Sequence, residues 1–508
     1  MRITNKMLTN NMMFNINKNK NNLSVLDDQY SSGKKIQRPS DDPIIAARAL
    51  KLRTNLSELN QYYKKNIPDA MSWMDITEGA LTNINTMLTK LNTSCVQGAN
   101  DILTVSDRSS IVENLEEFKQ QIYQEGNTDY AGRYVFSGYK TDTSLSFKDA
   151  STTLDYEITE KFAGTDMESI TKVTGEYSLD KYHEDTTLND FSKAPDLIET
   201  HRIRLAYENL KDTGITSISY MKDGELVDIA VTIKSVTDTT TYSPTSGTPF
   251  EAGIPPKPDI PAVLGVINFI PETGELIMPD DVYEELRLAE DITVTYDKNV
   301  FKEGDLRPEH YFDCKATDTL TSKVTNYTKA DQEIQYEINF DQKLTINTQG
   351  SDAIQQGLGR DIDEILQAVQ DVVSTETKIS EVNKMLKDGQ VTTKQTASLE
   401  ELLGQLESSL ALKNKIMNSK FEQGIAGTAE EQKTLNVAVS DLGSRYVRLE
   451  LTESRLSSQQ SDFEELLSNN EDADMVETII KYNSAETIYN ASLSVASKVV
   501  QNTLLDFL

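Results

Sequence analysis

Apolar residues recur at helical spacing near the start of the chain, in a stripe that begins at Thr9 and ends at Tyr30. The stripe is thin, because Asn and Lys fill most positions around it. A helix with so narrow a seam buries too little surface to order alone, so we expect it to order only when paired. The stripe comprises Met12, Ile16, Asn19, Leu23, Leu26 and Tyr30.

A second and stronger stripe follows, with spacings that alternate between four and three residues, as in a coiled coil. It predicts one long helix from Ile45 to Leu91. Pro68 lies inside this pattern and removes a helical hydrogen bond, so we expect a kink or short break near Ile67. The stripe comprises Ile45, Ala49, Leu52, Leu56, Leu59, Tyr63, Asn66, Ala70, Trp73, Thr77, Ala80, Ile84, Met87 and Leu91.

The helical period is lost in the middle of the chain. A third helix is predicted over Ser106 to Gly126, and aromatic and β-branched residues around a glycine predict a hairpin over Tyr130 to Phe147. Residues 148–344 are rich in Thr, Val, Ile and turn residues, which predicts a β-rich insert, possibly of two lobes. Within it we expect a helical segment near Asp196 to Leu210 and a Pro- and Gly-rich loop over Thr239 to Pro261.

Helical spacing returns from Ser351, and Ser468 to Asp474 separates two further seams. The first is Leu435, Val439, Leu442, Tyr446, Leu449, Glu453, Leu456, Gln460, Phe463 and Leu467; the second is Met475, Ile479, Tyr482, Glu486, Tyr489, Leu493, Ala496, Val500, Thr503 and Phe507. The sequence therefore predicts an α+β fold in which both chain ends form one long antiparallel, coiled-coil-like bundle. The β-rich insert would extend from the tip of that bundle.

This pattern predicts three domains. Terminal helices 1–43 and 469–508 would be disordered in the monomer, residues 44–147 and 345–468 would form the helical core, and 148–344 would form an outer insert.

The stretch SSGKKIQRPSDDP separates the first two helices and forms a joint between them. A glycine can end a helix, while Asp or Ser followed by Pro can begin one by capping its free N–H groups. The residues of this joint are Gly33, Lys34, Lys35, Arg38, Ser40, Asp41, Asp42 and Pro43. We expect the joint cations Lys34, Lys35 and Arg38 to meet an acidic surface on a neighbouring copy.

Charge and composition narrow the classes of function. The net charge of −31 disfavours a nucleic-acid partner, which needs Lys and Arg to neutralise phosphates. The first 65 residues are nevertheless basic, with 12 Lys and Arg against 5 Asp and Glu. The amino end lacks the apolar run of a secretory signal peptide, and no stretch is apolar enough to predict membrane insertion. The two cysteines, Cys95 and Cys314, do not indicate a disulfide framework.

Several segments, in order, resemble the flagellin family of bacterial flagellar axial proteins. They are SSGKKIQRPSDDPIIAARAL, ITEGALTNINTMLTKLN, GRYVFSGYKTDTSLSF, DLGSRYVRLELTESRL and VQNTLLDFL. The resemblance covers about residues 1–147 and 340–508. Within the family, MRITNKML, the Pro-Ser-Asp-Asp-Pro of the joint and FSGYKTDT are similar to the members that join hook to filament, whereas filament-forming members usually have Asp-Asp-Ala at the joint.

The resemblance implies a structural subunit of the extracellular flagellum that assembles as a ring of about eleven copies. Its implied partners are copies of itself, the other junction protein, flagellin, the flagellar type III export apparatus and a cytoplasmic export chaperone at the carboxy-terminal helix. Residues predicted to pack between subunits or to bind the chaperone are Met12, Ile16, Leu23, Leu26, Tyr482, Tyr489, Leu493, Val500 and Leu504. Two alternatives stay open: a filament flagellin, or an axial protein whose insert binds a ligand.

An enzymatic insert is a further alternative, because some flagellins carry a zinc peptidase there. That chemistry needs His-Glu-x-x-His on one helix, but the pair His183-Glu184 is followed by Thr187 where the second His would stand. His310 and Cys314 are four residues apart in a segment that reads as strand or turn, which disfavours a metal site. We therefore expect no catalytic, metal or cofactor-binding residue.

Overall fold

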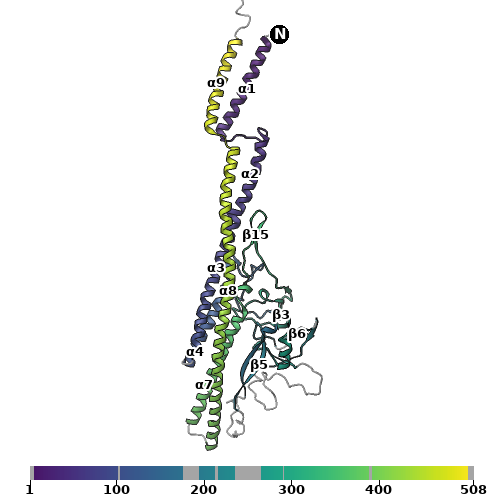
Figure 1. The fold of residues 1–508 in the computed structure, drawn as a ribbon, viewed down its shortest axis with the longest axis vertical. Coiled ribbons are helices and arrows are strands. Elements are labelled where there is room, and N and C mark those ends of the chain that lie inside the picture. The colour runs from purple at the N-terminus through teal and green to yellow at the C-terminus, as the bar shows by residue number, and fades with distance from the viewer. Residues whose placement is uncertain are drawn as a thin grey trace, which may run out of the picture. The chain divides into compact units, whose positions relative to one another are not determined.

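The computed structural model describes most of the chain, in two separately packed units (Figure 1). The described residues are 5–100, 103–174, 194–211, 215–222, 224–234, 265–289, 291–387 and 392–500. The first unit contains Met1–Met71, Tyr336–Leu344 and Tyr446–Leu508, and the second contains Ser72–Gln335 and Thr345–Arg445. Helices dominate both ends and strands the middle, so the predicted α+β class is confirmed.

The helices follow the predicted seams closely. They are α1 (Asn5–Ser32), α2 (Pro43–Gln61), α3 (Ile67–Gly98), α4 (Val105–Glu125), α5 (Asp280–Leu286), α6 (Gly350–Ala353), α7 (Gln356–Lys387), α8 (Thr393–Glu471) and α9 (Met475–Val500). A π-helical turn, Tyr62–Asn66, lies directly before Pro68, where we expected an irregularity. Pro68 has no N–H, and the Ile67 N–H bonds to the Tyr62 carbonyl five residues back, which widens the turn without ending the helix.

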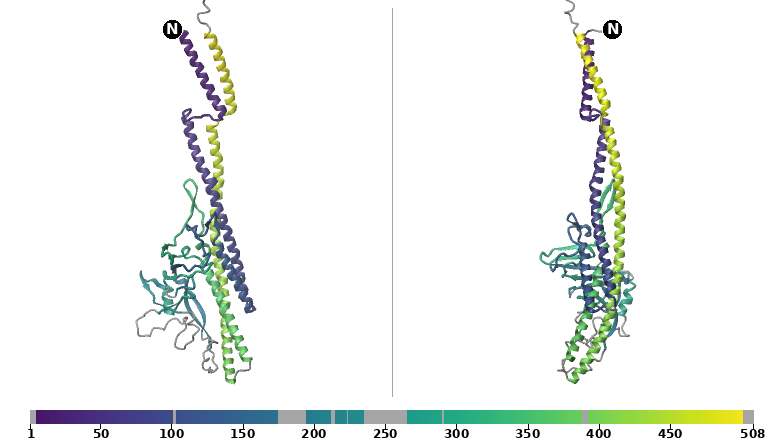
Figure 2. Two further views of the ribbon diagram at one scale, coloured as in Figure 1. Left: turned by 180° about the vertical axis from the view of Figure 1, so that it is seen from behind. Right: turned by 90° about the vertical axis from the view of Figure 1, so that its left-hand side faces the viewer.

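In the first unit, α1 lies beside α9, and α2 lies beside the part of α8 that follows Tyr446 (Figures 1 and 2). The buried seam of the second pair includes Ala49, Leu59, Leu449 and Leu456. The tip of the hairpin formed by β14 (Gln335–Asn339) and β15 (Gln342–Thr345) belongs to this unit. The hairpin is held by Asn66 Nδ2, which donates to the Glu337 carbonyl at 2.8 Å, and by an edge-on contact of Tyr62 with Phe340.

In the second unit, two antiparallel-rich sheets make up most of the insert. One has the order β4-β5-β10-β9-β8 and the other β13-β12-β3-β11-β6-β7. Their strands are β3 (Leu154–Phe162), β4 (Glu168–Thr174), β5 (Asp196–Arg204), β6 (Ile215–Lys222), β7 (Glu225–Asp228), β8 (Val231–Ile233), β9 (Ile267–Ile270), β10 (Glu275–Met278), β11 (Ile292–Lys298), β12 (Asp313–Asp318) and β13 (Val324–Tyr327). Side chains of both sheets enclose one hydrophobic core that includes Ile158, Ile203, Leu276 and Val294.

Two expectations about the insert are wrong. The segment near Asp196 to Leu210 is not helical, because its first nine residues form β5, which pairs with both β4 and β10. The insert also does not simply extend from a bundle tip. Arg202 and Arg204 of β5 form ion pairs with Glu364 of α7, so the sheet rests against the side of this helix (Figure 1). The predicted loop at Thr239 to Pro261 lies outside the described residues.

The predicted hairpin after α4 is present only as a short pair, β1 (Asp129–Tyr130) and β2 (Arg133–Tyr134), followed by turns. It covers Trp73 of α3, which belongs to the second predicted stripe and is 1% exposed. The Arg133 guanidinium lies 5.0 Å from the centroid of the Trp73 ring, and the Tyr130 ring meets it edge-on. Arg133 thus packs its flat cation against the indole face.

Candidate functional site

The joint between α1 and α2 has the predicted local structure. Gly33 ends α1, since its N–H bonds to the Gln29 carbonyl and its φ of +67° is readily adopted only by glycine. Asp42 is the N-cap of α2, because its carboxylate accepts hydrogen bonds from the N–H groups of Ile44 and Ile45 at 2.9 and 3.1 Å. Pro43 occupies the first turn, where its missing N–H costs nothing.

The other joint residues hold the turn itself or point to solvent. The Asp41 carboxylate accepts hydrogen bonds from the backbone N–H groups of Gln37 and Arg38 at 3.1 and 2.8 Å, which closes the turn before the cap. Ser40 and the Arg38 side chain are exposed.

Two joint cations find their partners within the chain. Lys34 Nζ lies 2.5 Å from Asp472 and 3.5 Å from Glu471, and Lys35 Nζ donates to the Asn469 carbonyl at 2.5 Å. The hydrogen bond with Asp472 raises the pKa of Lys34 and lowers that of Asp472. Backbone bonds from Lys35 to Glu471 and from Ala473 to Gly33 connect the same segments. The joint before α2 and the one before α9 are therefore bound to each other, and Lys34 and Lys35 need no neighbouring copy for their contacts.

Asp42→Ala should destabilise the start of α2 by about 1 kcal/mol, because two backbone N–H groups lose their acceptor. Hydrogen exchange of the amides of Ile44 and Ile45 should become faster. Asp42→Asn keeps an acceptor oxygen and is the matched control. Equal exchange rates in both variants would show that the cap contributes nothing.

The α1 stripe faces α9 as the sequence predicts. Ile16 is buried, and Met12, Leu23 and Leu26 are half-buried, whereas most positions between them are exposed. Asn19 Nδ2 donates to the Ser492 hydroxyl at 2.9 Å, and Tyr30 stacks on Tyr482 with centroids 6.1 Å apart. Both contacts join α1 to α9, so the polar members of the stripe also lie in this interface.

The stripe predicted on α9 is only partly correct. Tyr482 and Tyr489 are half-buried as expected, but Leu493 is 42% exposed. The side that faces α1 is lined by small and polar residues that our pattern missed. The less exposed residues of α9 are Thr478, Tyr482, Ala485, Tyr489, Ser492 and Ala496. The side chain of Val500 and the whole of Leu504 lie outside what the structure describes.

The α1–α9 pair leaves large apolar side chains in solvent. Phe14 is 69% exposed, Val476 70% and Ile480 64%. Others on the two helices include Met7, Leu8, Met13, Val25, Ile488 and Val495. Exposed apolar residues that are this numerous on one helix pair mark an interaction surface. We call these residues the outward apolar face.

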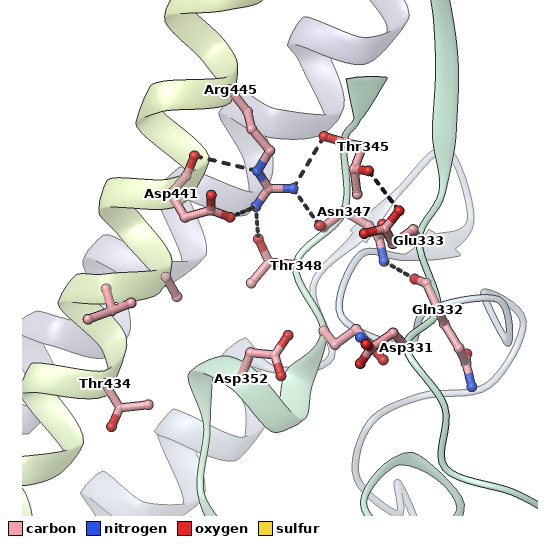
Figure 3. Close-up of a pocket in the computed structure, with 13 residues that line it drawn as sticks. Asp331, Gln332, Glu333, Thr345, Asn347, Thr348, Asp352, Thr434, Asp441 and Arg445 are labelled. Carbon is pink, nitrogen blue, oxygen red and sulfur yellow. Dashed lines mark hydrogen bonds and ion pairs between the residues drawn. The ribbon is translucent and has the colours of Figure 1, made fainter. Parts of the chain in front are cut away.

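A cavity of about 480 Å³ lies in the second unit between α8 and the segments around residues 331–333 and 345–352 (Figure 3). Its one arginine, Arg445, is engaged in the wall. The guanidinium donates to the Asn347 carbonyl at 2.7 Å and to the Thr348 hydroxyl at 3.2 Å, and it pairs with Asp441 at 2.8 Å. This arrangement fastens the 345–348 segment to α8 and leaves no free cation in the cavity for an anionic ligand.

The histidine and cysteine side chains that could serve catalysis or bind a metal have structural surroundings. No three His, Cys, Asp or Glu residues gather as a metal site in the part of the chain that the structure describes, and His183-Glu184 lies outside it. His310 Nε2 lies 3.1 Å from the Ser144 carbonyl, and burial lowers its pKa to about 4. Cys95 and Cys314 are buried and unbridged, and burial raises the pKa of each thiol to about 12. None of the described helices is long and apolar enough to cross a bilayer.

Comparison with known families then identifies both ends of the chain. Residues 3–141 match the bacterial flagellin N-terminal helical region, and residues 425–508 match the bacterial flagellin C-terminal helical region. Both ends of the chain are therefore similar to the flagellin family. The matched regions contain the joint, both helices of the α1–α9 pair and the outward apolar face, so the family signature coincides with the candidate site.

Individual relatives carry two kinds of name. The chain is 30% identical to a flagellin of Clostridium tyrobutyricum over 174 residues, which are 34% of this chain and 46% of that protein. It is 31% identical to flagellar hook-associated protein 3 of Salmonella typhimurium over 145 residues, 28% of this chain and 45% of that protein. The chain thus spans less than half the length of these curated relatives.

Solved structures with related descriptions resemble the chain only loosely. A flagellar hook-associated protein from Vibrio parahaemolyticus is 11% identical to this chain, and the TM-score is 0.35. The aligned region covers 85% of this chain and 100% of that protein. A flagellar hook-associated protein-3 from Legionella pneumophila is 12% identical, and the TM-score is 0.29. The aligned region covers 82% of this chain and 97% of that protein.

Two buried carboxyl groups should make the second unit of the chain sensitive to pH. Burial raises the pKa of Glu160 to about 7 although it accepts hydrogen bonds from the Tyr296 hydroxyl and the Ala206 N–H, and burial likewise raises the pKa of Glu431 to about 7. A folded pKa above the unfolded value gives stability that is complete below about pH 4.5 and is lost as the pH rises through about 7. We therefore expect these groups to make the unit less stable at pH 8 than at pH 5.

The test is to compare urea unfolding at pH 5 and pH 8 for the natural chain and for Glu160→Gln/Glu431→Gln. The double variant should show a smaller difference between the two pH values, by about 2 kcal/mol or more, because an amide does not titrate. Glu225→Gln, at an exposed position, is the control. An unchanged pH dependence in the double variant would contradict the assignment.

Proposed function

We propose that this chain is a structural subunit of the bacterial flagellum that joins the hook to the filament and forms the ring on which flagellin polymerises. The observation that carries the proposal is the outward apolar face of the α1–α9 pair, which no described residue of the chain covers. Identical neighbours that bury this face would make assembly cooperative while the monomer stays soluble. Two relatives, which match 145 and 118 residues of the chain, are named flagellar hook-associated protein 3.

The proposal includes specific partners. A ring of about eleven copies would contact the other junction protein on one side and flagellin on the other. The chain would leave the cell unfolded through the flagellar type III apparatus and function in the extracellular flagellum. Before export, a cytoplasmic chaperone would cover α9, as in other helix-in-groove complexes. Because Tyr482 and Tyr489 face α1 in the folded pair, a chaperone that bound them would compete with α1.

A purely structural role is the simplest account of the second unit as well. The chemistry-bearing groups described above are occupied by structural contacts, as shown by Arg445 in the cavity wall and His310 beside Ser144. We propose no catalytic activity for the chain. A peptidase assay of the purified protein with and without a chelator would reveal one if it exists.

A second candidate function is that of a filament flagellin, because the relative from Clostridium tyrobutyricum carries that name. The joint sequence Pro-Ser-Asp-Asp-Pro favours the junction role. The two functions differ in copy number: a flagellin would be the bulk component of sheared filaments, whereas a junction subunit would be a trace component at their base.

Deletion of the encoding gene tests the proposal. The mutant should keep its hooks, lack filaments and release flagellin into the medium. Filaments of normal length in the mutant would overturn both candidate functions. Loss of filaments without release of another flagellin would instead support the filament role.

A further inference from the structure

The α2–α8 pair of the first unit carries opposite charges on its two helices. From Pro43 to Asn66 there are five Lys and Arg residues and one carboxylate, Glu58. From Tyr446 to Glu471 there are six Asp and Glu residues and two arginines, Arg448 and Arg455. The two helices pack on each other, but most of these charged side chains form no ion pair between them.

One ion pair joins these two segments in the described structure, between Arg53 and Glu471 at 2.7 Å. The remaining cations of α2 and the turn after it are exposed and have no carboxylate within 4 Å. We call them the basic edge: Arg48, Lys51, Lys64 and Lys65. Since the apolar seam of α2 faces α8, these side chains lie away from α8 or at its margins.

The acidic residues of α8 are placed in the same way. Leu449 and Leu456 are buried, and four of the six carboxylates of this segment are exposed, whereas Glu453 is half-buried and Glu471 is buried. Among the described residues, the exposed carboxylates have no cation within 4 Å, and Glu464 accepts a hydrogen bond from the Gln460 side chain at 2.9 Å. We call them the acidic edge: Glu450, Asp462, Glu464 and Glu465. Of the two arginines in this segment, Arg455 donates a hydrogen bond to the Gln342 side chain at 3.3 Å.

We infer that adjacent copies of this chain contact each other with the basic edge of one copy against the acidic edge of the next. The inference rests on the proposed assembly into a ring. In a closed ring of identical subunits each contact is heterologous, so one surface of a copy must fit a different surface of its neighbour. Opposite charges on the two helices satisfy that requirement. Contacts that place two basic edges or two acidic edges together are disfavoured by like-charge repulsion.

The occupant of each edge is therefore a second copy of the chain. The unused charges are long side chains in solvent, which fix orientation and register more than they add affinity. The outward apolar face of the α1–α9 pair would supply affinity, and the two edges would select the neighbour and its orientation.

Charge reversal tests the inference in full-length chains. The basic-edge variant carries Lys51→Glu, Lys64→Glu and Lys65→Glu, and the acidic-edge variant carries Glu450→Lys, Glu464→Lys and Glu465→Lys. Each alone should lower the number of filaments per cell in the deletion strain by about tenfold or more, because like charges then meet at every contact of the ring. A chain with all six changes should recover most of the filaments, since the edges are again complementary.

The matched control reverses three exposed lysines of the second unit, with Lys161→Glu, Lys323→Glu and Lys415→Glu. It has the same net charge as the basic-edge variant and should assemble normally. Circular dichroism of each purified chain checks that it folds.

The outcomes separate the inference from the proposed function. Edge complementarity is wrong if the two variants with three substitutions assemble like the control. It is also wrong if the variant with all six substitutions forms as few filaments as those two variants. If the deletion strain has normal filaments without any copy of the chain, the proposed function is wrong. Recovery of filaments in the variant with all six substitutions supports both the edge contact and the proposed function.

Discussion

Phe14→Asp should abolish filament growth and leave the monomer intact. Phe14 is the most exposed aromatic residue of α1, and it belongs to the outward apolar face. Its replacement in the monomer should change the free energy of unfolding by no more than about 0.5 kcal/mol, because it makes little contact there. In the assembled ring, each copy would lose the burial of a phenyl ring and would have to desolvate a carboxylate instead.

The loss for each copy is about 3 kcal/mol or more, which weakens each contact by at least about a hundredfold. Filaments are counted by electron microscopy in the deletion strain that expresses the variant, and the medium is tested for the exported chain. We expect the variant to appear in the medium without filaments on the hooks.

Asn15→Asp is the matched control, because it adds the same charge at the next exposed position of α1. It should assemble, since a polar residue there has no apolar burial to lose. Filaments of normal number with Phe14→Asp would show that the outward apolar face is not buried on assembly. Equal failure of both variants would point to the added charge itself and not to apolar burial.

The contrast between α1 and α9 shows what helical periodicity can predict. On α1 the named residues recur at helical spacing among many Asn and Lys residues, and they are less exposed than apolar residues outside the stripe, such as Phe14 and Val25. On α9 apolar residues occur around the whole circumference, so the pattern offered several stripes. The sequence could not indicate that small residues such as Ala485 and Ser492 would allow α1 to approach, while Ile480 and Leu493 would stay outside.

The joint was predictable for a different reason. Capping depends on a few neighbouring residues, so Gly33, Asp42 and Pro43 act locally and their roles could be inferred without tertiary information. The partners of Lys34 were not predictable, because Glu471 and Asp472 are more than 430 positions away in the sequence. A local pattern indicates how a helix ends but not which segment it meets.

The error at β5 has a physical cause as well. The strand DLIETHRIR has the charged and polar content of a solvated helix, yet it pairs with strands on both sides. Arg202 would be out of place in a central strand unless acids surrounded it. Those acids come from β4, β10 and α7, which the sequence does not bring together until the sheet is formed.

Arg202→Met should be the most destabilising single change in the second unit, at about 3 to 5 kcal/mol. The guanidinium is buried and contacts three carboxylates: Glu168 and Glu364, each at 2.6 Å, and Glu275. Glu275 is itself buried, and Glu364 is largely so. Removal of the cation leaves these negative charges in a low-dielectric site, which costs more than the lost attraction alone.

Urea unfolding followed by the fluorescence of Trp73, the one tryptophan of the chain, measures this effect within the same unit. Lys222→Met is the matched control, because it breaks the more exposed pair with Glu285 and should cost less than about 1 kcal/mol. Arg202→Met/Glu275→Met removes a buried charge of each sign and should be more stable than Arg202→Met alone. Additive losses in the double variant would mean that the two residues are not coupled.

The same cluster should make this unit sensitive to acid. Burial alone would raise the pKa of Glu275, but Lys172 and Arg202 outweigh it and lower the pKa to about 2. Burial opposes ionisation of Glu364 too, yet Arg202, Arg204 and Lys420 hold its pKa well below the usual range. A depressed folded pKa gives stability that is complete above the unfolded value near 4.5 and is lost as the pH falls toward 2. In Arg202→Met the pKa of both carboxyls should rise. The free energy of unfolding, followed by the fluorescence of Trp73, should therefore fall less between pH 4.5 and 2 than it does in the natural chain. An equally steep fall would assign the acid sensitivity to other carboxyls.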